Sequence, residues 1–154
     1  MIAAGAGIAP FRGFIQELSA LQERSGTRVP PAILFYGCRS EEEDDLYRQE
    51  MDEYERDGVV SVRRALSRRL ADGGMGMGTG KKYYVGDRIW DDREEVKRLW
   101  DEGAKVYVCG SRAVGDGVKK VMGRVVLGDG AGEEEVKVWF EGVRTSRYAV
   151  DVFD

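Results

Sequence analysis

The sequence Met1-Ile2-Ala3-Ala4-Gly5-Ala6-Gly7-Ile8-Ala9-Pro10 decides the fold. Its first residues form a short apolar strand, and the glycine turn that follows leads into an amphipathic helix. Glycine lets a backbone turn sharply and approach another group closely. Pro10 suits a first helical turn, because the N–H that proline lacks would be unpaired there. Such a turn brings backbone N–H groups to the start of a helix, where they can bind a phosphate group.

The rest of the chain alternates between short apolar runs and amphipathic runs. The apolar runs at 32–36, 59–62 and 105–109 are typical of buried parallel strands, and 148–153 reads as a final strand or extended tail. Apolar residues at three- and four-residue steps predict helices around 11–21, 46–54, 96–100, 114–125 and 136–143. Glycines at 72–80 and 129–132 predict a loop and a turn. This alternation indicates βαβ units, so we expect an α/β fold: a three-layer, doubly wound parallel sheet with helices on both faces.

The composition limits the possible functions. The 154 residues fit one domain spanning 1–154, and 42% hydrophobic with 34% charged residues is a globular balance. A net charge of −4 argues against nucleic acid as a partner, because a phosphate backbone needs a basic face. The chain has no histidine, which excludes hydrolases with an imidazole base and leaves no zinc-ligand cluster. We therefore expect no bound metal.

The cysteine content and the apolar runs indicate a cytoplasmic chain. Cys38 and Cys109 are too few for a disulfide framework. No run approaches the roughly 20 apolar residues that cross a bilayer, and the first residues lack the pattern of a signal peptide. The short apolar stub before the glycine turn suggests that the chain is part of a longer parent. That parent could be associated with the endoplasmic reticulum membrane.

The glycine turn by itself is open to two interpretations. The usual dinucleotide fingerprint has a third glycine where this chain has Pro10. The turn is therefore either a different dinucleotide turn or a plain connection from strand to helix. The turn alone favours neither interpretation.

The end of the second predicted strand favours a nucleotide with an additional phosphate. An NAD site needs an acidic residue about 20 residues after the turn, whereas this strand ends in Gly37-Cys38-Arg39-Ser40. Ser67 and Arg68 follow the third strand, and Lys81, Lys82 and Tyr84 follow the glycine-rich loop. Arginine offers a forked pair of N–H donors and lysine a compact positive charge, and both suit a doubly charged phosphate group. This favours NADPH over NADH. The alternative is a solvated charged face formed by Arg63, Arg64, Arg68 and Arg69.

Several further motifs occur in a fixed order along the chain. They are Gly5-Ala6-Gly7-Ile8-Ala9-Pro10-Phe11-Arg12-Gly13-Phe14, Phe35-Tyr36-Gly37-Cys38-Arg39-Ser40, Asp44-Asp45-Leu46-Tyr47, Ser67-Arg68, Val108-Cys109-Gly110 and Arg147-Tyr148-Ala149-Val150-Asp151-Val152-Phe153. Together they resemble the diflavin reductases of the NADPH–cytochrome P-450 reductase type. Gly86-Asp87-Arg88-Ile89-Trp90 and Cys109-Gly110-Ser111-Arg112-Ala113-Val114-Gly115 are similar to the C-terminal NADPH-binding domain of self-sufficient fungal fatty-acid hydroxylases.

This resemblance implies a ferredoxin-reductase-like NADP-binding module. Hydride would pass from NADPH to FAD, and electrons would continue through FMN to a haem. The FAD-binding domain of the same parent would be the direct partner, with the FMN and haem domains as acceptors. The turn at 5–10 would hold the pyrophosphate and nicotinamide ribose, with Cys38 and Arg39 near the phosphates. Ser67, Arg68 and Lys82 would bind the 2′-phosphate, and Tyr84 would pack against the adenine end.

The resemblance also implies which residues lie at the reacting ring. Cys109 would stand near the nicotinamide C4, with Gly110 and Ser111 in the cofactor site, and Asp151 would orient the ring. Phe153 would stack on the flavin and move away before hydride transfer. From the residues alone, Cys109 is more commonly an inert core thiol, Asp151 a solvated acid and Phe153 a hydrophobic side chain that closes the sheet. Only the paired motifs favour the functional roles.

Three positions depart from the pattern of the family. Ala6 stands where threonine is common, Gly86 where glutamine is frequent and Phe153 where many members have tryptophan. The first change removes a hydroxyl near the nicotinamide, and the second removes a polar contact to the adenine end. The third should weaken the stack on the flavin and loosen discrimination between NADPH and NADH.

Two other functions are compatible with the sequence. A free-standing dehydrogenase needs a general acid or base and a substrate site, for which a short chain without histidine leaves little room. A binding module would keep affinity for NADPH without turnover, because the chain contains no FAD domain. Among reductases, the acceptor could also be that of a sulfite reductase or a nitric oxide synthase.

Overall fold

The computed structural model describes residues 1–40, 42, 44–68 and 82–153. Its centre is a five-stranded sheet with the strand order β3-β2-β1-β4-β5, and every pair of neighbouring strands is parallel. The strands are β1 (Ile2–Ala4), β2 (Ile33–Cys38), β3 (Ser61–Leu66), β4 (Val106–Ser111) and β5 (Tyr148–Phe153). In this register Ile2 of β1 lies between Phe35 of β2 and Val108 of β4.

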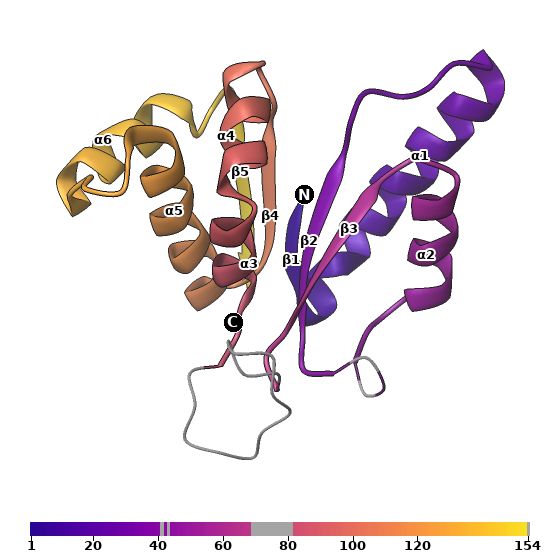
Figure 1. Cartoon of the computed structure of the whole chain (residues 1–154), viewed down its shortest axis with the longest axis horizontal. Coiled ribbons are helices and arrows are strands. Elements are labelled where there is room, and N and C mark those ends of the chain that lie inside the picture. Colours follow the sequence, from indigo (N-terminus) through magenta and orange to yellow (C-terminus); the bar gives the residue numbers. More distant parts are fainter. Residues whose placement is uncertain (41, 43, 69–81, 154) are drawn as a thin grey trace.

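Helices cover both faces of the sheet (Figure 1). A 3₁₀ helix, Gly5–Ile8, leads from β1 into α1 (Ala9–Ser25), which lies on one face together with α2 (Arg48–Arg56). The opposite face carries α3 (Val85–Asp91), α4 (Arg93–Asp101), α5 (Arg112–Leu127) and α6 (Glu133–Val143). The predicted α/β class and its three-layer, doubly wound parallel sheet are therefore confirmed.

Successive side chains of each strand point to opposite faces, and this alternation produces two apolar cores. Ala3 and Tyr36 belong to the core beneath α1 and α2. Ile2, Phe35 and Val108 belong to the core beneath α3, α4, α5 and α6. Because both faces are buried, the central strands are apolar throughout, which is why they read as continuous apolar runs in the sequence.

Local signals set the ends of the helices. Gly26 ends α1 in the left-handed region, at a φ of 65°, and donates its N–H to the Gln22 carbonyl. Ser111 begins α5, and its Oγ accepts a hydrogen bond from the Val114 N–H at 3.4 Å. Both signals satisfy backbone groups that a helix end would otherwise leave unpaired.

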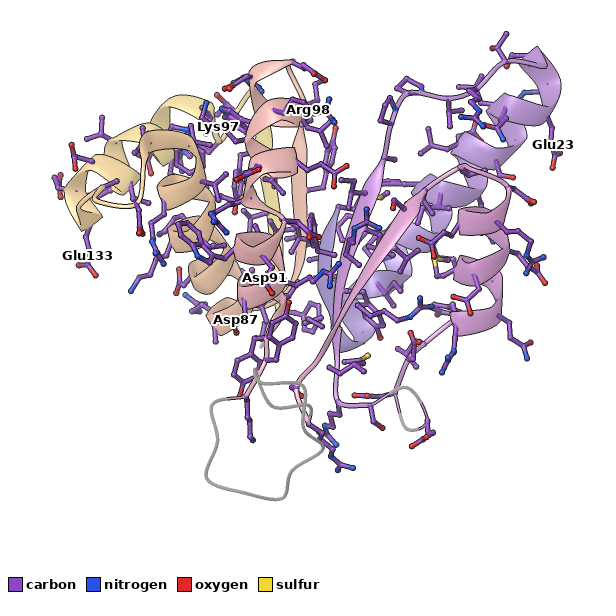
Figure 2. The ribbon with its side chains drawn as sticks, viewed as in Figure 1. Glu23, Asp87, Asp91, Lys97, Arg98 and Glu133 are labelled. Atoms are coloured by element: carbon purple, nitrogen blue, oxygen red, sulfur yellow. The ribbon has the colours of Figure 1, made fainter. Side chains whose placement is uncertain are left out.

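Charged side chains lie on the outer surfaces of the helices (Figure 2). On α4, Lys97 and Arg98 pair with Asp101 and Glu102, which lie one turn further on. Across the ranges that the structure describes, no polar or charged residue is buried as a whole. Within the same ranges, no helix combines the length and apolar character needed to cross a membrane.

The structure differs from the sequence prediction mainly at the ends of elements. Strand β3 begins at Ser61, later than the predicted run, because Val59 and Val60 are buried before the strand pairing starts. Helix α2 begins only at Arg48, because Tyr47 takes the left-handed region at a φ of 59°.

Helix α3 was not predicted from the sequence. Its seven residues are too few to show a clear helical repeat, although Val85 and Ile89 are buried at a four-residue step. The turn predicted at 129–132 is confirmed, since it joins α5 to α6. The glycine-rich loop predicted at 72–80 lies outside the described residues.

Glycine allows α5 and α6 to pack closely, and this contact can be tested. A Cβ on Gly123 would lie 2.6 Å from both Cγ atoms of Val136, whereas a Cβ on Gly117 of the same helix would meet open space. We expect Gly123→Ala to destabilise the domain by about 1–3 kcal/mol, as overpacking does. Gly117→Ala should stabilise it by about 0.5–1 kcal/mol, because alanine favours a helix. Denaturant unfolding measures both, and the same sign for the two variants would contradict this packing.

Candidate functional site

The strand order reverses its direction between β1 and β4. The chain leaves β1 for α1 on one face and leaves β4 for α5 on the other, so the two connections diverge from neighbouring strands (Figure 1). In open parallel sheets ligands bind at such a point, outside the carboxyl ends of the strands. The glycine turn follows β1, and Gly110 and Ser111 end β4. The fold thus brings these two predicted segments together.

The glycine turn is in close backbone contact with β4. Gly5 takes a φ of 54°, in the left-handed region that favours glycine. A Cβ on Gly7 would lie only 2.2 Å from the carbonyl oxygen of Cys109. Ile8 is fully buried and anchors the turn. The small residues Ala6 and Ala9 and also Pro10 remain exposed, so the turn presents little side-chain bulk to a ligand.

The start of α5 follows the end of β4 at the same place. Gly110 is buried, and a Cβ on it would lie 3.3 Å from Cγ1 of Val114 in the first turn of the helix. Ser111 is the N-cap residue, so its hydroxyl serves the helix start. Helix starts carry partial positive charge, which favours an anionic ligand.

The ends of β2 and β3 bring the predicted phosphate-binding residues side by side. The Ser67 N–H donates to the Cys38 carbonyl at 2.8 Å, and the Arg68 N–H donates to the Arg39 carbonyl at 3.1 Å. Cys38 is buried, whereas Arg39 and Arg68 are exposed. The two exposed arginines therefore extend from neighbouring backbone positions at the carboxyl edge of the sheet.

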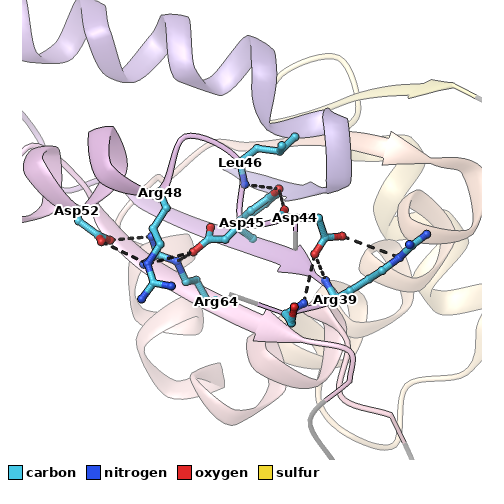
Figure 3. Close-up of polar contacts among 9 residues, drawn as sticks. Arg39, Asp44, Asp45, Leu46, Arg48, Asp52 and Arg64 are labelled. Atoms are coloured by element: carbon cyan, nitrogen blue, oxygen red, sulfur yellow. Dashed lines mark hydrogen bonds and ion pairs between the residues drawn. The ribbon is translucent and has the colours of Figure 1, made fainter. Parts of the chain in front are cut away.

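The arginines within β3 take part in ion pairs of the fold. Arg64 donates to both Asp45 and Asp52, each at 2.7 Å (Figure 3). Arg63 lies 3.4 Å from the carboxylate of Asp92. These two arginines are therefore half-buried members of ion pairs, and they do not form a solvated face.

The segment before α3 lies beside the end of β2. The Cβ of Val85 would be 3.5 Å from a Cβ placed on Gly37 of β2. Lys82 and Tyr84 immediately precede Val85, and both are exposed. Their predicted place near Arg39 and Arg68 is therefore compatible with the fold. Two other basic residues of the sequence prediction, Arg69 and Lys81, lie outside the described residues.

The last strand places Asp151 next to Cys109. The two residues are partners in the register of β4 and β5. Cys109 is 4% exposed, whereas Asp151 is exposed. Burial raises the pKa of the Cys109 thiol, and the negative charge of Asp151 raises this pKa further. The thiol is therefore protonated at neutral pH.

Phe153 lies next to Ser111 in the same register and is 49% exposed. A Cβ on Gly115 would lie 2.9 Å from Cγ1 of Val152, so Val152 faces α5. Because side chains alternate along a strand, Phe153 and Asp151 share the face opposite α5. The half-exposed ring of Phe153 is accessible to a stacking partner.

Two residues of this edge had no predicted role. The Asp44 carboxylate accepts a hydrogen bond from the Arg39 N–H at 2.6 Å, and the Tyr36 hydroxyl donates to the Asp44 carbonyl at 3.0 Å. Asp44 belongs to a motif that carried the family resemblance, which is the signal that could have drawn attention to it. The hydrogen bonds themselves depend on the path of the connection between β2 and α2.

The sheet topology and this edge define a dinucleotide-binding domain of the doubly wound class. The oxidoreductase NAD-binding domain family matches residues 1–120. The chain belongs to this family.

Relatives that are named as monooxygenases and reductases match the chain over nearly its whole length. A self-sufficient cytochrome P-450 monooxygenase of Oidiodendron maius is 47% identical over 99% of the chain. Bifunctional cytochrome P-450/NADPH–P-450 reductases of Fusarium oxysporum and Bacillus subtilis are 45% and 36% identical, each over 99% of the chain. The chain spans 14% of the length of each of these relatives. The resemblance seen in the sequence motifs is confirmed.

The environment of Cys109 predicts slow thiol chemistry. The thiolate is the reactive form, and both burial and Asp151 disfavour it. With Cys38 replaced by serine, we expect Cys109 in the folded chain to react with iodoacetamide at pH 8 at least about tenfold more slowly than in denaturant. Adding Asp151→Asn should speed the folded-state reaction, because it removes a negative charge. Equal rates with and without denaturant would contradict the buried, protonated thiol.

Proposed function

We propose that the chain is the NADPH-binding domain of a flavoprotein reductase that passes hydride from NADPH to FAD, and electrons through FMN to a haem monooxygenase. The observation that carries this proposal is the juxtaposition of Arg39 and Arg68 at the ends of β2 and β3. Two guanidinium groups from adjacent positions suit phosphate dianions, whereas a site for NADH needs a carboxylate for the ribose hydroxyls. Ser67 and Lys82 add further donors at this place.

The residues at the carboxyl ends of the strands fit a dinucleotide. Gly5 and Gly7 let the turn lie against β4, and the exposed small side chains of Ala6 and Ala9 leave space for a diphosphate to approach the backbone. Arg39 and Arg68 supply positive charge at this edge, although the chain as a whole has a net charge of −4. The exposed ring of Tyr84 would pack against the adenine end.

Bound NADPH supplies the hydride from its nicotinamide ring. In the proposed site, Cys109 lies beside that ring with Gly110 and Ser111 at the end of β4. Its thiol is protonated, so it makes a neutral contact and is not a nucleophile. Asp151 places negative charge on the same face, where it would stabilise the positive charge that develops on the ring as hydride leaves. Both residues thus orient the ring and adjust its electrostatics.

Phe153 would stack on the flavin where the nicotinamide must enter. It lies at the end of an edge strand that pairs with β4 on one side only, and about half of its ring is exposed. Such a ring has few contacts to keep it in place. In the proposed cycle it moves away before hydride transfer.

The names of the relatives support the proposed partners. The Fusarium oxysporum protein is named a bifunctional cytochrome P-450/NADPH–P-450 reductase, and the chain spans 14% of its length. We infer that the FAD-binding domain of the same parent is the direct partner, and that FMN and haem domains accept the electrons. The parent would act on the cytoplasmic side, at the endoplasmic reticulum membrane if it is anchored.

The exposed face of Asp151 and Phe153 favours a second reading for the chain by itself, that of a binding module without turnover. Mixing the chain with NADPH and free flavin distinguishes the binding module from a free-standing dehydrogenase. A free-standing dehydrogenase would oxidise NADPH unaided with its own substrate, whereas the isolated module would bind nucleotide and transfer nothing.

The arginine pair predicts a preference for NADPH over NADH. We expect Arg68→Ala to weaken NADPH binding about tenfold or more, because a charge-assisted contact to the 2′-phosphate is lost, and to leave NADH binding unchanged. Isothermal titration calorimetry measures both affinities. Arg24→Ala is the matched control, since Arg24 lies in the last turn of α1 and pairs with Glu17. Equal affinities of the unmodified chain for the two nucleotides would overturn the preference.

The position of Cys109 predicts an effect on rate more than on binding. In the full-length parent, Cys109→Ala should slow flavin reduction by NADPH about tenfold, the effect of roughly 1.4 kcal/mol in the barrier. NADPH affinity should change little, because the phosphate contacts remain. Stopped-flow absorbance measures the rate and calorimetry the affinity. An unchanged rate would remove Cys109 from the proposed hydride-transfer site.

A further inference from the structure

Asp44 lies at the nucleotide edge but has no part in the mechanism proposed above. It belongs to the connection between β2 and α2, and its Oδ1 accepts hydrogen bonds from the backbone N–H groups of Arg39 at 2.6 Å and Ser40 at 3.2 Å. Its other oxygen lies 4.0 Å from Nε of Arg39 (Figure 3). One carboxylate thus contacts both the backbone and the guanidinium of an arginine whose side chain is 70% exposed.

The backbone of Asp44 is hydrogen-bonded to Tyr36, a residue of the core beneath α1 and α2. The hydroxyl of Tyr36 donates to the Asp44 carbonyl at 3.0 Å and accepts a hydrogen bond from the Leu46 N–H at 3.4 Å. Tyr36 is 1% exposed, and burial raises its pKa to about 12, so the hydroxyl keeps its proton. The exposed Arg39 is therefore connected, through Asp44, to the buried Tyr36 of β2.

The carboxylate also decides which donors this loop offers. Consecutive backbone N–H groups can form a small concavity that binds anions. Here the N–H groups of Arg39 and Ser40 donate to Asp44, so they are not available to a phosphate. What the loop presents to an anionic ligand is the guanidinium of Arg39.

We propose that Asp44 is a positioning residue that directs Arg39 toward the phosphate groups of the dinucleotide, an inference that rests on the proposed function. Two effects of removing Asp44 have opposite signs. If the carboxylate acted by charge alone, its loss would strengthen binding of an anion, because a nearby repulsion would disappear. If it positions Arg39, its loss weakens binding, because the forked donor loses its direction.

The test compares the affinity for NADP⁺ of the unmodified chain and of Asp44→Asn, by calorimetry. Asparagine keeps an oxygen acceptor for the two N–H groups but removes the charge that faces the Arg39 guanidinium, and we expect about tenfold weaker binding. Asp44→Glu, which keeps the charge but displaces it by one methylene, should also weaken binding. Melting temperatures of both variants report whether the fold is retained.

Asp52→Asn is the matched control. It removes the same charge from the neighbouring pair with Arg64, and it should change the affinity for NADP⁺ less than about twofold, as expected of a charge near the surface. A weakening as large as that of Asp44→Asn would show that any lost carboxylate has this effect, and would overturn the proposal.

A double-mutant cycle separates positioning from a general loss of structure. In an Arg39→Ala background, Asp44→Asn should have no further effect on NADP⁺ binding, because the residue that it positions is gone. Unchanged or tighter binding of Asp44→Asn, or an equal loss in both backgrounds, overturns the inference while leaving the proposed function intact. Failure of the unmodified chain to bind NADP⁺ would overturn both.

Discussion

The close packing of the glycine turn on the end of β4 is the contact on which the rest of the structure depends. A methyl group at Gly7 would overlap the Cys109 carbonyl, so the turn and the strand can meet only because this position has no side chain. The contact joins β1 to β4, the two strands from which the chain departs to opposite faces. It therefore brings the proposed phosphate-binding turn and the proposed nicotinamide-binding strand to one edge of the sheet.

The arginines near this edge of the sheet differ in how far their side chains are exposed. The Arg64 side chain is 18% exposed and serves two carboxylates of the fold, whereas that of Arg39 is 70% exposed. A chain of net charge −4 thus still has exposed arginines at the ends of β2 and β3, whereas Arg64 is largely buried between two carboxylates. A negative net charge argues against nucleic acid as a main partner, but it is compatible with a local site for a small anion.

Much of the fold could be predicted from the sequence, because continuous apolar runs alternate with amphipathic ones. The strand order could not, since the sequence does not show which strands pair, and α3 has too few residues to show a repeat. Gly5 and Gly7 were found because backbone geometry demands glycine there. Asp44 and Tyr36 were missed, because their hydrogen bonds depend on how the connection after β2 folds back. The roles of Cys109, Asp151 and Phe153 came from family motifs and stay predictions.

The pairing of β5 with β4 has a consequence for how the carboxyl-terminal residues can vary. Asp151 lies beside Cys109 only in the present register, in which Val150 and Val152 take the face toward α5. Inserting or deleting a single residue between 148 and 151 would exchange the two faces of the strand, turning the acid toward the helix and a valine toward the thiol. The length of this last segment is therefore constrained as strictly as its composition, and two-residue changes should be tolerated better than one-residue changes.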